Sequence, residues 1–194
     1  MYAKRKEITM AKVIEVFAMK GGVGTSTASL AIAHQATEQG LRVLLVDNAV
    51  NHDICNLAGI PSKAEQEWDN LTIKQLSRTD KMHQYSNEFD LVVVDCGANP
   101  TDIFDEDAER VLVVRNEYLS LRNAVSVKKD RAVCFYQEGN ALIQGDIKNV
   151  LSTEVIFVPI DTAVSRAIDA GMFFSRGIVH EWAKDFVETK TTVA

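Results

Sequence analysis

The sequence predicts a single α/β domain built on a mostly parallel, doubly wound sheet with helices on both faces. Short runs of apolar and β-branched residues alternate along the chain with segments rich in helix formers, as in repeated strand–helix units. The runs are apolar on both faces, which is typical of strands in a parallel sheet that helices cover on both sides. A glycine-rich turn joins the first run to the first helical segment.

The expected elements follow from these patterns in chain order. Residues 13–18 form a short β-rich run that ends at the glycine turn, and residues 26–39 carry good helix formers before Gly40, a natural helix stop. Further strands are expected at residues 41–47, 91–95, 110–115, 131–136 and 154–159. The stretch from about 50 to 89 is polar and poor in strand signals, so we expect helices and loops there. A last helix is expected over residues 179–187.

Length and composition indicate one globular unit. The chain has 194 residues, which is ample for one domain and too short for two large ones. Hydrophobic residues make up 46% of the chain and charged residues 25%, so a sizeable core is expected and wholesale disorder is excluded. No proline- or glycine-rich linker interrupts the sequence. We expect residues 12–194 to form a single domain and residues 1–11 to be an N-terminal tail.

Charge and cysteine content limit the classes of function. The formal net charge of -6 argues against a constitutively basic nucleic-acid clamp, although it leaves room for a local basic patch. The three cysteines are far apart and form no metal-binding pair, so we expect buried, reduced thiols in a cytoplasmic protein. No apolar run reaches the ~18 residues that span a bilayer, and the short, non-basic C-terminal tail disfavours a membrane-binding helix. Neither a membrane nor a zinc site is therefore expected.

The glycine-rich turn is the most informative segment. Residues 18–27 read AMKGGVGTST, between a predicted strand and a predicted helix. Such a turn aims backbone N–H groups at one point beside a helix N-terminus, which makes a phosphate cradle, and the Ser26 hydroxyl lies where these loops hold Mg2+. The common pattern G-x-x-x-x-G-K-[ST] is not met, because Thr25 occupies the lysine position. Taken alone, the turn is also compatible with a purely structural strand-to-helix connection.

The string K-G-G-V-G-T-S-T, residues 20–27, resembles the deviant Walker A motif K-G-G-x-G-K-[ST]-T of the ParA/MinD family of P-loop ATPases. Residues 43–47 look like that family's Walker A' strand, which ends in an aspartate. Residues 89–97 resemble its Walker B segment, and residues 158–171 its P-x-D loop and following helix. These matches occur in the family's order, so the resemblance implies a P-loop NTPase fold.

The resemblance also implies ligands and an assembly. Members of this family sandwich ATP with Mg2+ between two subunits, so ATP or ADP, Mg2+ and a homodimer are expected. Lys20 would reach the partner's phosphates and, with Asp47 positioning the attacking water, would be catalytic. Ser26 would bind Mg2+ directly, and Asp95 through a water. These types suit phosphoryl transfer, which depends on positioning and charge neutralisation.

Further residues would contact the nucleotide itself. The phosphates would be wrapped by Gly21, Gly22, Val23, Gly24 and Thr25, with Thr27 supporting the α-phosphate. Pro159 and Asp161 belong to the P-x-D loop and would also contact the nucleotide. Gln137 stands where the family usually reads adenine with an asparagine, and Ala49 where it often has an acidic residue.

The main departure from the family is Thr25, which replaces the loop lysine. A hydroxyl cannot replace a cation that neutralises the β- and γ-phosphates, so we expect weak or absent hydrolysis, and whether the chain is an enzyme stays open. Three interpretations remain: a natural variant that binds ATP but hydrolyses it poorly, a pseudo-ATPase, or an engineered block.

Two sets of charged residues each have a structural and a functional interpretation. The basic residues are Lys128, Lys129, Arg131, Arg115, Arg122 and Arg166. They are either solvated surface charges or, as in ParA-like proteins, part of a non-specific DNA-binding surface. The acidic residues are Asp102, Asp105, Glu106, Asp107 and Glu109, which we expect on a solvated helix, with partner docking as the alternative.

We therefore expect a ParA-like ATP-binding partition or positioning protein of a plasmid or other mobile element. It would be a nucleotide-sandwich dimer with non-specific DNA binding, regulated by a partner protein. The alternative is a non-hydrolysing pseudo-ATPase adaptor in conjugation, pilus positioning or polar localisation, which ATP-independent dimerisation would favour. A metabolic P-loop enzyme is less well supported, because no small-substrate constellation is visible.

Overall fold

The computed structural model describes residues 11–61, 65–75, 85, 87–100, 106–174 and 180–187. Of the expected N-terminal tail, only Ala11 falls within these ranges. Nothing in them tests whether residues 12–194 form one domain, although every described strand belongs to the same sheet.

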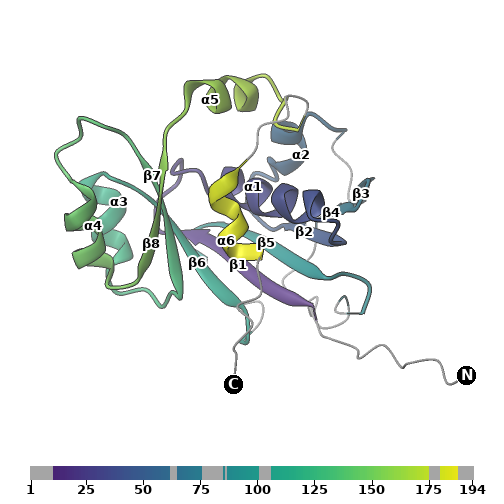
Figure 1. Ribbon diagram of the computed structural model, residues 1–194, viewed down its shortest axis with the longest axis horizontal. Coiled ribbons are helices and arrows are strands. Elements are labelled where there is room, and N and C mark those ends of the chain that lie inside the picture. Colours follow the sequence, from purple (N-terminus) through teal and green to yellow (C-terminus); the bar gives the residue numbers. More distant parts are fainter. Residues whose placement is uncertain are drawn as a thin grey trace, which may run out of the picture.

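Eight strands form the sheet in the order β3-β4-β2-β5-β1-β6-β7-β8 (Figure 1). Their bounds are β1 (Lys12–Ala18), β2 (Val43–Asp47), β3 (Glu65–Trp68), β4 (Leu71–Lys74), β5 (Leu91–Ala98), β6 (Glu109–Arg115), β7 (Arg131–Tyr136) and β8 (Glu154–Pro159). Neighbouring strands are parallel except β3, which is antiparallel to β4. The strand order runs outward in both directions from the centre, so the predicted doubly wound, mostly parallel α/β class is confirmed.

Helices cover both faces of the sheet. They are α1 (Thr25–Glu38), α2 (Ile54–Ala58), α3 (Tyr118–Ala124), α4 (Gln144–Leu151), α5 (Thr162–Asp169) and α6 (Lys184–Val187), the last preceded by a 3-10 turn, η2 (Glu181–Ala183). Figure 1 places α3 and α4 together beside β7 and β8, whereas α1 lies near α2 and α6. Each face has its own core, because alternate residues of a strand point to opposite sides.

β1 illustrates how the two cores are divided. Ile14 and Val16 are fully buried against the face that α1 and α6 cover, whereas Phe17 packs into the other core with Leu121 of α3 and Ile147 of α4. Burial of one such side chain is worth roughly 1.5–3 kcal/mol. The apolar pattern on both faces thus holds β1 at the centre of the sheet, and the glycine turn leaves from its carboxyl end.

The prediction of helices and loops over residues 50–89 is wrong in part. The short helix α2 is present, but β3 and β4 form a hairpin that extends the sheet beside β2. Leu71 and Ile73 face the core while Thr72 does not, so β4 alternates over only four residues, too few to stand out in a polar stretch. Asp69 takes a positive φ of 48° in the tight turn between the two strands.

The expected helix over residues 179–187 is shorter than predicted. Residue 179 lies outside the described ranges, η2 precedes α6, and α6 begins only at Lys184. The predicted packing role of its aromatic residues is confirmed: the Trp182 ring centroid lies 6.1 Å from that of Phe135 and 6.2 Å from that of Phe186, with the rings edge to face. This contact joins the C-terminal segment to β7.

The helix expected for the acidic residues is wrong where it can be checked. Glu106 and Asp107 lie in a turn and Glu109 begins β6, because the buried run that follows pairs with β1 and β7. Asp102 and Asp105 lie outside the described residues. The predicted burial of the cysteines is confirmed, since Cys55, Cys96 and Cys134 are all buried. Within the described ranges, no helix is long and apolar enough to cross a membrane.

Candidate functional site

The glycine turn connects β1 to α1 through residues 19–24. Gly22 and Gly24 have φ angles of 74° and 106°, a left-handed region that residues with a Cβ rarely adopt. A Cβ added to Gly24 would also lie 2.8 Å from Cε2 of Phe135. The carbonyl of Gly24 accepts the hydrogen bond of the Ala28 N–H at 2.9 Å, so α1 starts directly from the turn. The free N–H groups at the start of α1 therefore face the same space as the turn.

An open groove of about 510 Å3 lies over this turn. Its lining combines the turn and the start of α1 with the segment that follows β2, the last residues of β5 and β6, and one face of α5. The lining residues are Gly21, Gly22, Gly24, Thr25, Ser26, Thr27, Ala49, Val50, Asn51, Asp53, Gly97, Ala98, Arg115, Ser165, Ile168 and Asp169. The groove thus lies at the carboxyl ends of the central strands, where the strand order reverses and open α/β sheets bind ligands.

Two carboxylates lie at this edge of the sheet. Asp47 at the end of β2 is directly opposite Asp95 in β5, and both residues are fully buried. One oxygen of each is satisfied by backbone: Asp47 Oδ2 accepts from the Ile54 N–H at 3.2 Å and Asp95 Oδ1 from the Gly97 N–H at 3.0 Å. Asp47 Oδ1 and Asp95 Oδ2 are buried without a hydrogen bond, although His52 Nδ1 is 3.5 Å from the former. Buried oxygens in this state are costly without a cation or water.

Burial shifts both carboxyl groups toward the protonated form. Burial raises the pKa of Asp95 to about 6. The Ser26 hydroxyl and the Gly97 N–H, which donate to the carboxylate, lower this pKa and so offset part of the effect of burial. The nearby charges of Asp47 and Asp53 raise it further. Burial likewise raises the pKa of Asp47, opposed by the Ile54 N–H and by His52. A bound cation would favour the ionised form of both groups.

The chemistry of these oxygens suits Mg2+. Mg2+ prefers oxygen ligands, keeps several waters and is usually bound through one or two carboxylates together with substrate phosphates. The Ser26 hydroxyl lines the groove and hydrogen-bonds Asp95, whose second oxygen is unsatisfied. The described residues contain no group of three or more His, Cys, Asp or Glu side chains that could hold a metal by themselves. The site therefore fits a cation that phosphate oxygens help to bind.

Lys20 lies at the head of the turn and is already paired. Its Nζ lies 2.8 Å from Oε2 of Glu117, the residue immediately before α3. Both side chains are 38% exposed. In this arrangement Lys20 contacts its own chain and does not line the groove.

Thr25 occupies the first turn of α1 and is buried. Its carbonyl accepts the hydroxyl of Ser29 at 3.1 Å. Val23 is buried beneath the turn, whereas Thr27 reaches both the groove and a second, smaller cavity. The replacement of the family's lysine thus leaves no cation at this position of the helix.

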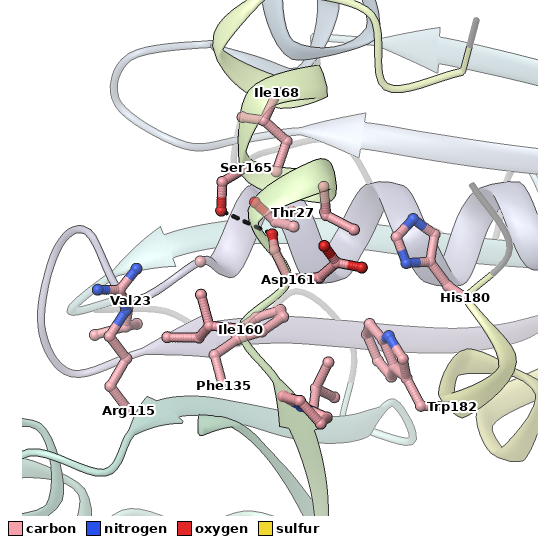
Figure 2. A pocket seen from close by; sticks show the side chains of 14 residues that line it. Val23, Thr27, Arg115, Phe135, Ile160, Asp161, Ser165, Ile168, His180 and Trp182 are labelled. Atoms are coloured by element: carbon pink, nitrogen blue, oxygen red, sulfur yellow. Dashed lines mark hydrogen bonds between the residues drawn. The ribbon is translucent and has the colours of Figure 1, made fainter. Parts of the chain in front are cut away.

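The second cavity, of about 90 Å3, adjoins the groove (Figure 2). Pro159 and Asp161 line it together with Phe135, Trp182 and His180. Asp161 fixes the start of α5, because its Oδ1 accepts the Ala163 N–H at 2.6 Å and its carbonyl accepts the Ser165 hydroxyl at 3.1 Å, the dashed line in Figure 2. The structure therefore brings the P-x-D residues next to the glycine turn.

Gln137 does not join them. It follows β7, is exposed, and is not among the residues that line either cavity. Its backbone is held by Asn116, whose Oδ1 accepts the Gln137 N–H at 3.0 Å and whose Nδ2 donates to the Gln137 carbonyl at 2.8 Å. Its role in base recognition stays a prediction.

Sequence reasoning missed several lining residues. Arg115 was considered only as a solvated charge or as part of a DNA-binding surface, and neither Phe135 nor His180 was assigned to the site. Burial lowers the pKa of His180 to about 4, with a smaller contribution from His34, so His180 is neutral at pH 7. The one signal for Arg115 was its place at the carboxyl end of a strand that neighbours the glycine turn.

Comparisons with known proteins agree with this geometry. A family model described as "AAA domain" matches residues 11–67, which include the glycine turn and β2. A putative arsenical pump-driving ATPase 2 from Aquifex aeolicus (strain VF5) is 34% identical over 70 residues, 36% of this chain. The matched segment spans only 23% of that relative's length.

Solved structures resemble the whole fold. The MinC:MinD cell division protein complex of Aquifex aeolicus matches with a TM-score of 0.69 at 20% identity, over 83% of this chain and 86% of that one. A ParA family ATPase from Chlorobium tepidum TLS matches with a TM-score of 0.67 at 16% identity, over 92% of this chain and 98% of that one. The septum site-determining protein MinD from Pyrococcus horikoshii OT3, complexed with Mg-ADP, matches with a TM-score of 0.67 at 15% identity, over 92% of this chain and 93% of that one. The predicted P-loop NTPase fold, of the ParA/MinD type, is confirmed.

Proposed function

We propose that this chain binds ATP and ADP with Mg2+ in the groove over the glycine turn. The observation that supports this most directly is that Ser26, just after that turn, lines the groove and interacts with Asp95, which pairs with Asp47, each aspartate having a buried oxygen without a hydrogen bond. Backbone N–H groups on one side and a cation site on the other are what a polyphosphate requires. The MinD of similar fold that was solved with Mg-ADP supports the same assignment.

The proposed roles rest on the resemblance of the motifs to the ParA/MinD pattern, and for the turn residues also on their position in the groove. Gly21 to Thr25 wrap the phosphates, and Thr27 supports the α-phosphate at the entrance to the second cavity. Ser26 and Asp95 are the residues that would hold Mg2+, which when bound would neutralise phosphate charge. Asp47 would orient a water beside the terminal phosphate. Pro159 and Asp161, with Gln137 at the adjacent strand end, are the candidates for the base.

We propose further that the nucleotide switches the chain between monomer and sandwich dimer, so that it partitions or positions a cargo such as a plasmid or other mobile element. Lys20 lies half-exposed beside the groove and would leave Glu117 to reach a partner's phosphates. Turnover is expected to be weak or absent, because Thr25 brings no charge to the transferred group. A regulatory partner protein and non-specific DNA complete this proposal.

The basic residues do not contribute equally to a DNA surface. Lys129 Nζ donates to the carbonyls of Ala124, Val125 and Val127, and Arg131 is paired with Glu109 and stacked on Phe186. Those two cations therefore stabilise the fold. Any DNA contact would use the more exposed basic residues, Arg122, Lys128 and Arg166.

A pseudo-ATPase adaptor is the second candidate, favoured by the uncharged Thr25 and by the pairing of Lys20 within its own chain. Titration calorimetry with Mg-ATP, together with sedimentation in its presence and absence, separates the two. Micromolar binding, nucleotide-dependent dimerisation and a nucleotide-dependent gain in DNA affinity support the switch. Dimerisation without nucleotide supports the adaptor. Absence of binding, both by this chain and by Thr25→Lys, would reject the nucleotide site.

A further inference from the structure

The groove contains a cation that neither the sequence motif nor the proposed roles use. Among the described residues that line it, the single Lys or Arg side chain is that of Arg115. Lys20, the other cation near the turn, is paired with Glu117. Because Thr25 carries no charge, Arg115 is the cation best placed to face a ligand bound over the turn.

The sheet holds Arg115 in this position. It is the last residue of β6, which pairs with β1 on one side and with Phe135 of β7 on the other. Its N–H donates to the Ser120 hydroxyl at 3.0 Å, which fixes the backbone where α3 follows. In Figure 2 the side chain extends from the end of β6 toward the glycine turn and lies beside Val23. It lines both the groove and the second cavity, as Gly24 and Thr27 do.

Among the described residues, the guanidinium group has no protein partner. Its Nε is buried and makes no hydrogen bond, and no ion pair to Arg115 is found within the part of the chain that the structure describes. None of the carboxylates that line the two cavities is found in an ion pair with Arg115: Asp161 caps α5, Asp169 is the last residue of α5, and Asp53 immediately precedes α2. A buried donor without an acceptor is costly, so this arrangement indicates an anion that is bound during function.

We propose that Arg115 supplies, from β6, the positive charge on bound nucleotide phosphates that Thr25 cannot supply from the turn. A guanidinium presents a rigid fork of donors that can bind two phosphate oxygens at once, so it suits a nucleoside di- or triphosphate at the junction of the two cavities. This inference rests on the proposed nucleotide site and goes beyond it, because it explains how a turn without its lysine retains affinity.

The test is calorimetric titration of Mg-ATP and Mg-ADP into the full chain and five variants, one of which is Thr25→Lys by itself. Arg115→Ala should weaken binding about tenfold to a hundredfold, as expected for lost hydrogen bonds to a charged group. Arg115→Lys should recover part of the loss, since it restores the charge without the fork. Thr25→Lys, added to Arg115→Ala, should restore binding. Lys148→Ala, which removes an exposed cation on α4, is the control and should bind as the unaltered chain does.

The outcomes are distinguishable. Rescue by Thr25→Lys cannot come from a merely structural role of Arg115, and thermal unfolding without nucleotide confirms that each variant is folded. Unchanged binding by Arg115→Ala, or no rescue, overturns the inference while leaving the nucleotide site intact. Binding by Thr25→Lys alone, with none by the unaltered chain, also overturns it. If neither the unaltered chain nor Thr25→Lys binds, the proposed function fails and the inference fails with it.

Discussion

Lys20 Nζ lies 2.8 Å from Glu117 Oε2, so the lysine at the head of the glycine turn is held by the residue that begins the approach to α3. Both side chains are partly exposed, and ion pairs of this kind contribute about 0–1 kcal/mol. The contact is therefore weak enough to be exchanged for a phosphate. Whether Lys20 is free to bind a phosphate therefore depends on Glu117, a residue outside the glycine turn.

Glu117→Gln is expected to release Lys20 and to strengthen nucleotide-dependent dimerisation several-fold, at a cost in stability of less than about 1 kcal/mol. Sedimentation velocity with Mg-ATP measures the dimer. Lys20→Gln in the same background should abolish the gain, because the released cation is then absent. An unchanged dimer affinity in Glu117→Gln would show that the pair does not restrain Lys20.

Ser26→Ala is expected to weaken ATP binding in the presence of Mg2+ and to leave metal-free binding nearly unchanged, because the lost hydroxyl would contact the metal and Asp95. Titrations with Mg2+ and with a chelator give the comparison. Ser29→Ala, one turn further along α1, removes a hydroxyl that donates to the Thr25 carbonyl and serves as the control. Equal losses in both conditions would count against a role of Ser26 at the metal.

Asp95→Asn is expected to stabilise the nucleotide-free chain at pH 7. The pKa of Asp95 is about 6 in the folded state and about 3.9 when unfolded, so the folded state holds more protons between these values. The contribution of Asp95 to the free energy of unfolding therefore falls as pH rises from about 4 to about 6. Removing the charge should recover on the order of 2–3 kcal/mol at pH 7 and little at pH 4.

Urea unfolding of both chains across this range measures the effect. The pKa of His180 is lowered to about 4, and its contribution has the opposite sign, rising with pH between about 4 and 6.5. His180 contributes equally to both chains. Subtracting the free energy of unfolding of the unaltered chain from that of Asp95→Asn at each pH therefore cancels its contribution. A difference that stays constant with pH would contradict a raised pKa of Asp95.

Gly24→Ala is expected to destabilise the fold by about 1–3 kcal/mol, because φ is 106° and the new Cβ would lie 2.8 Å from the Phe135 ring. Gly21→Ala is the control: no atom lies within 4 Å of its added Cβ, and its φ is not positive. Phe135→Leu should relieve part of the cost in Gly24→Ala but not the backbone strain. Equal stability of the two glycine variants, measured by thermal unfolding, would contradict this account.

Much of the fold could be predicted from local pattern. The central strands are continuous apolar runs, so their places along the chain agree with the sequence to within a few residues, as with β6 and β7. The hairpin of β3 and β4 could not be found in this way, because Leu71 and Ile73 are buried only when β4 pairs with β2 at the edge of the sheet. The extent of α6 was missed for a similar reason: its stability depends on packing under α1 rather than on its own length.

By itself the sequence determined the fold class, the glycine turn with its hydroxyl at Ser26, and the absence of a cation at Thr25. These depend on residues that are neighbours along the chain. Only the tertiary structure decided that Lys20 meets Glu117, 97 positions away, and that Arg115 faces the groove. Such contacts depend on strand order and register, which bring distant strand ends to one edge of the sheet and set the direction in which each side chain points.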